Sequence, residues 1–191
     1  RMGWSCIDAF TAVSAVRTMG LEAKAAIPFL AERLRDTDEY VRIDASFALQ
    51  KMGAEAVSSI TSLLPDSDPK VRELAVQTLR QIGPDAKAAI PAITARLWDD
   101  DAGVRQAAVI ALRTMGLEAR ASIPALAERL RDPDSYIRID ASHALEKMGT
   151  EAIPAITGMF HDPDERVREL AVRTLQRIEK DVLSSPPQSR R

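Results

Sequence analysis

Apolar side chains recur along this chain at intervals of three and four residues, the spacing of one face of an α-helix. An aspartate precedes five of these stripes and a glycine follows four of them, as Asp38 and Gly53 do around the first clear example. An aspartate accepts the free N–H groups of a first turn, and a glycine tolerates a left-handed cap at the end. The pattern therefore predicts a capped helix with this buried stripe: Val41, Ala45, Ala48, Leu49 and Met52.

A second helix is predicted after each glycine. In the segment 25–35 the side chains of Ile27, Leu30 and Leu34 share one helical face. Prolines stand near the start of this helix, where the missing N–H is tolerated or a kink results: Pro28, Pro91, Pro124 and Pro154. Each unit is therefore a predicted helical hairpin, which buries its apolar stripes only when it is stacked on neighbours.

The hairpin recurs along the chain. The phrase Asp-x-x-Val/Ile-Arg returns at intervals of about 30 or 33 residues. A longer block, which begins RTMGLEAKAAIP at Arg17, returns as RTMGLEARASIP at Arg113, a shift of about 96 residues. About two thirds of the paired positions are identical, which indicates duplication of a three-unit block. The aspartates of the phrase are Asp38, Asp68, Asp101, Asp134 and Asp164; the arginines are Arg42, Arg72, Arg105, Arg138 and Arg168; four glycines follow at Gly53, Gly83, Gly116 and Gly149.

The pattern D-x-x-VR-x-x-A-x-x-A-L-x-x-[IM]-G, followed by an I-P-x-[LI] helix, resembles HEAT repeats of the phycobilisome-lyase-like subtype. The resemblance covers most of the chain. It implies an all-α fold, an α-α superhelix of about six helical hairpins, in which the second helix of each repeat lines a concave face. Most members of this family bind other macromolecules, whereas a minority attach bilin pigments, hydroxylate a modified lysine with iron, or bind damaged DNA.

The predicted organisation is one repeat array over residues 1–183 and a disordered polar tail over 184–191. At the first unit Ser5 takes the capping position, but Asp8 and Ala9 replace the Val-Arg pair. Glu179 stands where the last unit should have its glycine. These departures mark capping repeats, or at the N-terminus the truncation of a longer array. The predicted units are near 5–36, 37–66, 67–99, 100–132, 133–162 and 163–183.

The charge composition argues against a dedicated nucleic-acid binder, because 26 basic residues are interspersed with 28 acidic ones. Cys6 is the single cysteine, so no internal disulfide framework is possible and a reducing compartment is favoured. No apolar run approaches the ~18 residues of a membrane span, and no secretory signal is visible. We therefore expect a cytoplasmic protein that does not enter a membrane.

The arginines of the Val-Arg pairs admit two interpretations. They could form a basic row that binds phosphates, or they could bind aspartates of their own and the next unit. Every arginine of the row comes with aspartates nearby, such as Asp36 and Asp38 for Arg42. We favour the internal Asp–Arg ladder, because it compensates charges held near a packed seam.

A set of positions on the second helix does not fit the packing pattern and predicts a partner-binding face. Spacings of three and four place each set on one side of its helix. Tyrosine, isoleucine and phenylalanine beside aspartate have the composition of an interface hot spot. The alternative is that Ile43 and Ile139 only cover gaps between repeats. The candidates on this concave face are Tyr40, Ile43, Asp44, Phe47, Lys70, Glu73, Gln77, Gln106, Ile110, Tyr136, Ile139, Asp140, His143, Arg166, Glu169 and Arg173.

No residue set in the sequence predicts catalysis. His143 and His161 are the only histidines. The resemblance includes iron-dependent hydroxylases, which use His-Glu pairs, but neither histidine here is followed by glutamate. Cys6 is interpreted as a small packed side chain rather than a nucleophile. Trp4 and Trp98 could stack on a base or pigment, but Trp98 precedes three aspartates and is expected to pack at a repeat edge.

The sequence thus predicts a non-catalytic scaffold that binds a protein or peptide on the concave face, without cofactor or metal. Two alternatives stay open: a bilin lyase or chaperone of the HEAT type, and a nucleic-acid-binding HEAT-like protein. We expect a monomer, or a weak homodimer through the terminal repeats.

Overall fold

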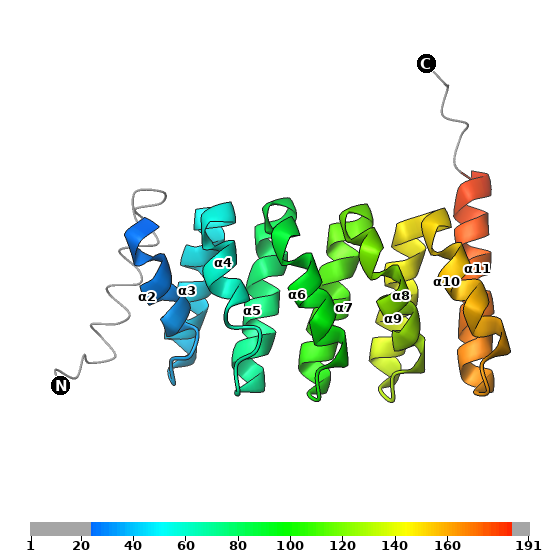
Figure 1. Cartoon of the computed structure of the whole chain (residues 1–191), viewed down its shortest axis with the longest axis horizontal. Helices are drawn as coiled ribbons and strands as arrows, with labels where there is room; N and C mark the ends of the chain where they lie inside the picture. Colours follow the sequence, from blue (N-terminus) through cyan, green and yellow to red (C-terminus); the bar gives the residue numbers. More distant parts are fainter. Residues whose placement is uncertain (1–23, 185–191) are drawn as a thin grey trace, which may run out of the picture.

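The computed structural model describes residues 24–184, and over that range the regular structure is entirely helical. Five long helices stand side by side in one layer, each packed against the next along the chain (Figure 1). The first four have 14 residues each and the last has 20. They are α3 (Glu39–Met52), α5 (Pro69–Ile82), α7 (Ala102–Met115), α9 (Ser135–Met148) and α11 (Glu165–Ser184).

A second layer holds short helices, each packed against the long helices beside it (Figure 1). The predicted second helix is shorter than expected, because turns of 3-10 helix flank most of these elements. The α-helical parts are α2 (Ile27–Arg33), α4 (Val57–Thr61), α6 (Ile90–Ala95), α8 (Ile123–Glu128) and α10 (Ile153–Thr157). The 3-10 parts are η2 (Gly53–Ala56), η3 (Gly83–Ala89), η4 (Arg96–Trp98), η5 (Gly116–Ser122), η6 (Arg129–Arg131), η7 (Gly149–Ala152) and η8 (Gly158–His161).

The long helices begin where the aspartates predict. Asp38, Asp68 and Asp134 each accept a hydrogen bond from the N–H two residues later, at 2.8, 2.9 and 2.7 Å. Asp101 accepts instead from the N–H of Val104 at 3.1 Å. Each bond satisfies a backbone donor that the helix itself leaves free.

The glycines end the first four long helices, but not in the predicted left-handed helical cap. Gly53 has φ 58° and ψ −133°, and Gly149 has φ 65° and ψ −141°. The positive φ was expected, whereas ψ lies far from the value near +47° of the left-handed helix. The chain therefore turns more sharply into the 3-10 segment, through a conformation that glycine alone adopts readily.

The core lies between the two layers and is made mainly of leucine, isoleucine and alanine. Leu49 and Leu79 of the long layer and Leu30 and Ile60 of the short layer are fully buried. Alanines such as Ala45 are buried as well, which lets neighbouring helices approach closely. This confirms the α-solenoid architecture that the repeat pattern predicts.

One feature of the prediction is wrong. With units that begin near residues 37, 67, 100, 133 and 163, the long helix comes first in its unit and the short helix second. The candidate residues from Tyr40 to Arg173 all lie on long helices, so they belong to the first helix of each unit. The expectations for Trp4, Ser5, Cys6, Asp8 and Ala9 lie outside the described residues, as does the tail from 185.

No helix between residues 24 and 184 is both long enough and apolar enough to cross a membrane.

Candidate functional site

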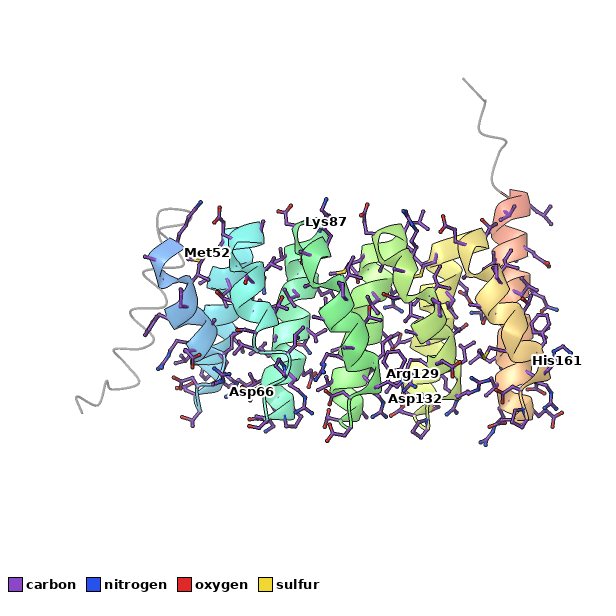
Figure 2. All side chains as sticks on the ribbon, viewed as in Figure 1. Met52, Asp66, Lys87, Arg129, Asp132 and His161 are labelled. Atoms are coloured by element: carbon purple, nitrogen blue, oxygen red, sulfur yellow. The ribbon has the colours of Figure 1, made fainter. Side chains whose placement is uncertain are left out.

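The loops that lead into the long helices lie along one edge of the array, where Figure 2 labels Asp66 and Asp132. In every loop an aspartate accepts a hydrogen bond from the N–H of the capping aspartate two residues later, at 2.9 to 3.1 Å. This bond fixes the turn before the helix begins. These loop aspartates are Asp36, Asp66, Asp99, Asp132 and Asp162.

The arginines of the Val-Arg pairs hold these loops together. Each donates from Nη1 to two backbone carbonyls of its own loop, as Arg42 does to Asp36 at 2.8 Å and Thr37 at 3.1 Å. The same pair of bonds recurs in the other four units. The arginine row therefore makes internal contacts, as the structural interpretation expected, but Arg42, Arg138 and Arg168 bind backbone carbonyls rather than aspartate carboxylates.

Two of these arginines also reach the loop of the next unit. Arg72 binds Asp99 from Nε at 2.9 Å and Nη2 at 2.6 Å, and Arg105 binds Asp132 at 2.9 and 3.2 Å. Burial acts to raise the pKa of Asp99, but hydrogen bonds from Arg72 and from the Asp101 N–H outweigh it and lower the pKa. The hydrogen bond with Asp99 raises the pKa of Arg72, so both groups stay ionised.

Other arginines form the remaining rungs, and the sequence reasoning missed them. Arg35 binds Asp66 at 2.6 Å, and Arg131 binds Asp162 in the same way. Arg35 and Arg131 are duplicates in the two blocks, and each stands just before one loop aspartate and binds the aspartate of the next loop. Pro65 and Trp98 hold this position in the other two units, and that exchange was the available signal. Arg72 therefore binds Asp99, with Arg96 at 3.3 Å, and Arg105 binds Asp132.

We call the outer surface of the five long helices the long-helix face. All the candidate partner-binding residues lie on it, and none is fully buried. They occupy positions two, five, six and nine after each capping aspartate, so they share one side of the layer. The structure thus brings the candidates together on one continuous face.

Large apolar side chains gather at two places on this face. The α3 patch consists of Tyr40, Ile43 and Phe47, which are 74%, 39% and 48% exposed. The α9 patch consists of Tyr136 and Ile139, which are 71% and 48% exposed. Exposed apolar groups that lie together on one face often mark an interaction site. The two patches are duplicates from the two blocks, except that half-buried His143 replaces Phe47.

Between the patches the face is more polar and is hollowed. Gly103 of α7 stands where α3 and α9 have tyrosine, a signal that the sequence analysis did not use. A depression of about 190 Å³ results, lined by Glu73, Gln77, Arg80, Gly103, Gln106, Ala107 and Ile110. A second depression of about 180 Å³ joins α3 to α5 and is lined by Ile43, Ser46, Phe47, Gln50, Leu74, Gln77, Arg80 and Gln81.

Some candidate residues have internal partners. Asp140 accepts hydrogen bonds from Gln106 at 3.1 Å and from Arg113 at 3.0 Å, which connects α9 to α7. Gln77 donates to Glu73 at 2.8 Å within α5. Asp140 and Gln106 therefore help to hold neighbouring long helices in register.

The described part of the chain contains no group of three His, Cys, Asp or Glu side chains placed to hold a metal ion. His143 lies on α9 and exposed His161 ends η8. Trp98 packs at a repeat edge as expected, with the Arg129 guanidinium 5.5 Å from its ring centre, although 54% of its surface is exposed. Arg129 also binds Asp132 at 3.3 Å, beside it in Figure 2.

Stacked helical hairpins joined by an Asp–Arg ladder define an α-solenoid of tandem repeats. The chain belongs to the HEAT repeat family, since the model of HEAT repeats matches residues 27–113 and 104–176. No curated protein matches the sequence.

Solved structures share the fold at low sequence identity. The complex of CpcE and CpcF of phycocyanin lyase from Nostoc has a TM-score of 0.61 and 20% identity, over 78% of this chain and 98% of that chain. Computationally designed armadillo repeat proteins for modular peptide recognition have a TM-score of 0.57 and 19% identity, over 91% of this chain and 94% of that chain. An archaeal HEAT-like repeats protein from Thermococcus onnurineus has a TM-score of 0.50 and 19% identity, over 100% of this chain and 85% of that chain.

Proposed function

We propose that this protein is a non-catalytic scaffold that binds a protein or peptide partner on its long-helix face. The observation that carries the proposal is the pair of exposed patches around Tyr40 and Tyr136. Tyrosine contributes a large rigid contact area at a small cost in side-chain entropy, and it is enriched at binding hot spots.

The arrangement of the face favours an extended partner. Helices α5 and α7 stand between the α3 patch and the α9 patch, so a partner that contacts both must cross four helices (Figure 1). The hollow around Gly103 offers a place for a side chain between the two contacts. Designed relatives of the fold were made for modular peptide recognition, which is consistent with such a mode.

Nucleic acid is a poorer fit than protein. Arg72 and Arg105, two of the arginines that recur in every unit, are paired with the carboxylates of Asp99 and Asp132, so their charge is already compensated. The long-helix face carries acids beside bases, with Glu73 and Glu169 near Lys70 and Arg166. A mixed face of this kind suits a protein surface.

The proposal is tested by affinity capture from a lysate of the source organism with three baits. One is the unchanged chain, and one carries Tyr40→Ala, Phe47→Ala, Tyr136→Ala and Ile139→Ala. The matched control carries Phe29→Ala and Leu117→Ala, which remove exposed apolar groups outside the long helices. Asp140 is left intact because it connects α9 to α7.

We expect a protein that the unchanged chain and the control capture and that the four-residue variant loses. Equal capture by all three baits would contradict the proposed face. Recovery of a bilin pigment or of salt-sensitive nucleic acid in place of a protein would contradict the scaffold function and support the corresponding alternative.

A further inference from the structure

The outer side of α11 exposes a surface that is buried in the four other long helices. The eighth residue after the capping aspartate is Ser46, Val76, Val109 or Ser142 in those helices, and each is at most 6% exposed. In α11 the same position is Val172, which is 40% exposed. The difference lies in the surroundings, because α5 and α11 are duplicates with valine at this position.

The hydrogen bonds between helices show which side of α11 is open. Thr174 of α11 bonds to Ser142 of α9 at 2.8 Å, just as Thr78 of α5 bonds to Ser46 of α3 at 2.9 Å. Both helices therefore face the preceding helix in the same way. The opposite side of α5 packs against α7, and the opposite side of α11 is the one that carries Val172.

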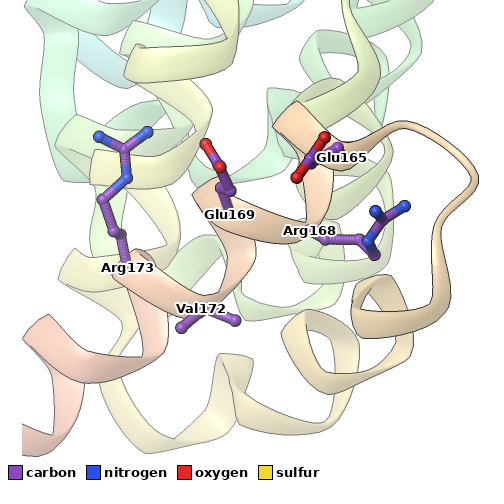
Figure 3. A pocket seen from close by; sticks show the side chains of 5 residues that line it. All are labelled: Glu165, Arg168, Glu169, Val172 and Arg173. Atoms are coloured by element: carbon purple, nitrogen blue, oxygen red, sulfur yellow. The ribbon is translucent and has the colours of Figure 1, made fainter.

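Arg168 lacks a contact that its duplicate has. Arg72 binds the Asp99 carboxylate of the next loop as well as two carbonyls of its own loop. Arg168 has the two carbonyl bonds, to Asp162 at 2.7 Å and Pro163 at 3.1 Å, and no carboxylate is bound to it in the described part of the chain. A shallow depression of about 500 Å³ is lined by Glu165, Arg168, Glu169, Val172 and Arg173. Figure 3 shows these five side chains on α11.

We infer that this surface docks the edge repeat of a separate HEAT-repeat protein, which continues the array. The inference is independent of the partner proposed for the long-helix face. It rests on continuity with the interface that the chain itself forms between α3, α5, α7, α9 and α11. An edge helix of the same kind would cover Val172 as α7 covers the same side of α5.

The interface within the chain defines the chemistry of the occupant. The tenth residue after each capping aspartate lies on the side toward the preceding long helix, as Thr78 and Thr174 show. This residue is small and at most 1% exposed in every long helix: Ala48, Thr78, Ala111, Ala144 or Thr174. The docking helix therefore needs alanine or threonine there. It also needs an aspartate two residues before its capping residue, because Asp99 occupies that position when it binds Arg72.

Two observations favour a separate protein over other sources. After Ile178 the chain has Glu179 in place of the turning glycine, and α11 continues to Ser184 instead of folding back as α5 does at Gly83. In the sequence, the positions of the first block that duplicate Asp99 and Asp100 are Gly3 and Trp4. The repeat that contains them therefore has no aspartate at the position that binds Arg72 in the internal interface, which disfavours this repeat of a second copy as the occupant.

The first test supplies a repeat of known sequence. Residues 83–132 are joined directly after Ile178 in place of 179–191, so that the duplicate of α7 follows α11. We expect the midpoint of thermal unfolding to rise by about 5 °C, since a further packed repeat adds an interface. Val172→Glu should lower the midpoint of the extended chain clearly and leave that of the parent chain nearly unchanged. Equal effects on both chains would overturn the inference.

The second test examines the partner itself. Baits with and without Val172→Glu are used for capture, beside the four-residue variant of the long-helix face. We expect a protein that Val172→Glu loses and the four-residue variant keeps, with HEAT repeats and an aspartate two residues before the capping residue of an edge helix. Failure to capture such a protein would overturn the inference. Self-association of the purified chain that Val172→Glu abolishes would assign the surface to a second copy and overturn it as well.

Discussion

Arg72 of α5 holds Asp99 of the following loop by two parallel hydrogen bonds, from Nε to Oδ2 at 2.9 Å and from Nη2 to Oδ1 at 2.6 Å. The Asp99 carboxylate also accepts from the N–H of Asp101, which caps α7. A single buried pair thus connects the start of one long helix to the start of the next. Both groups are buried, and the loss of one leaves the other with a weaker partner, Arg96 at 3.3 Å for Asp99 or the exposed Asp100 at 3.0 Å for Arg72.

Asp99→Ala should lower the free energy of unfolding by about 3 kcal/mol, since it removes the bidentate partner of buried Arg72 and leaves only the exposed Asp100 carboxylate at 3.0 Å. Arg168→Ala is the matched control, because this duplicate of Arg72 binds loop carbonyls only. We expect the control to cost about 1 kcal/mol. Urea unfolding followed by circular dichroism measures both. Similar losses for the two variants would show that the carboxylate contact contributes little.

Gly116→Ala should destabilise the array by about 1–3 kcal/mol, because Gly116 has φ 57° and ψ −130°, a conformation that is strained for any side chain. Nothing lies within 4 Å of an added Cβ, so the cost comes from the backbone alone. Gly158→Ala is the control: its surroundings are equally open, but φ is −58°. It should be neutral or stabilise by up to about 1 kcal/mol. The midpoint of thermal unfolding of both variants tests this expectation. A Gly116→Ala midpoint equal to that of the unchanged chain would contradict the argument from backbone strain.

Acid should weaken the array. The Asp164 N–H lowers the pKa of Asp162 most, against the effect of burial and with help from Arg131. The pKa of Asp66 is also lowered, since hydrogen bonds from the Asp68 N–H and Arg35 outweigh its burial. A lowered folded-state pKa means that the stability is complete above the unfolded value of about 4 and is lost as pH falls through the folded value.

We therefore expect the midpoint of thermal unfolding to change little between about pH 7 and pH 5 and to fall steeply below about pH 4. Asp66→Asn should show a shallower fall in acid than the unchanged chain, because one of the titrating carboxylates is gone. A midpoint that is constant down to about pH 3 would contradict the role of the loop aspartates.

The capped helices and the solenoid could be predicted from sequence because the signals are local and repeated. Asp38 before a helical stripe and Gly53 after it fix one helix, and its recurrence fixes the stacking. The Asp–Arg ladder was also predictable in outline. The individual arginine–aspartate pairs could not be predicted. Whether Arg35 or Arg42 binds Asp66 depends on how two units pack.

The candidate face was predicted as a set of positions, and its shape came only from the structure. The hollow at Gly103 and the bonds of Asp140 to Gln106 and Arg113 depend on neighbouring helices that lie far apart in sequence. The short layer was predicted as simple helices, but a 3-10 turn begins at each of the four glycines with positive φ, such as Gly83, and further 3-10 turns end several of the short helices. The assignment of the candidates to the second helix failed because periodicity does not tell where a unit begins.

The most direct test of the scaffold function is the dissociation constant of the captured partner, purified and titrated against three forms of the chain. These are the unchanged protein, the variant with Tyr40→Ala, Phe47→Ala, Tyr136→Ala and Ile139→Ala, and the control with Phe29→Ala and Leu117→Ala. Loss of hot-spot contacts should weaken binding by about 30-fold or more in the first variant, while the control stays within about twofold of the unchanged protein. Equal affinities for all three, or loss of binding in the control alone, would contradict the account.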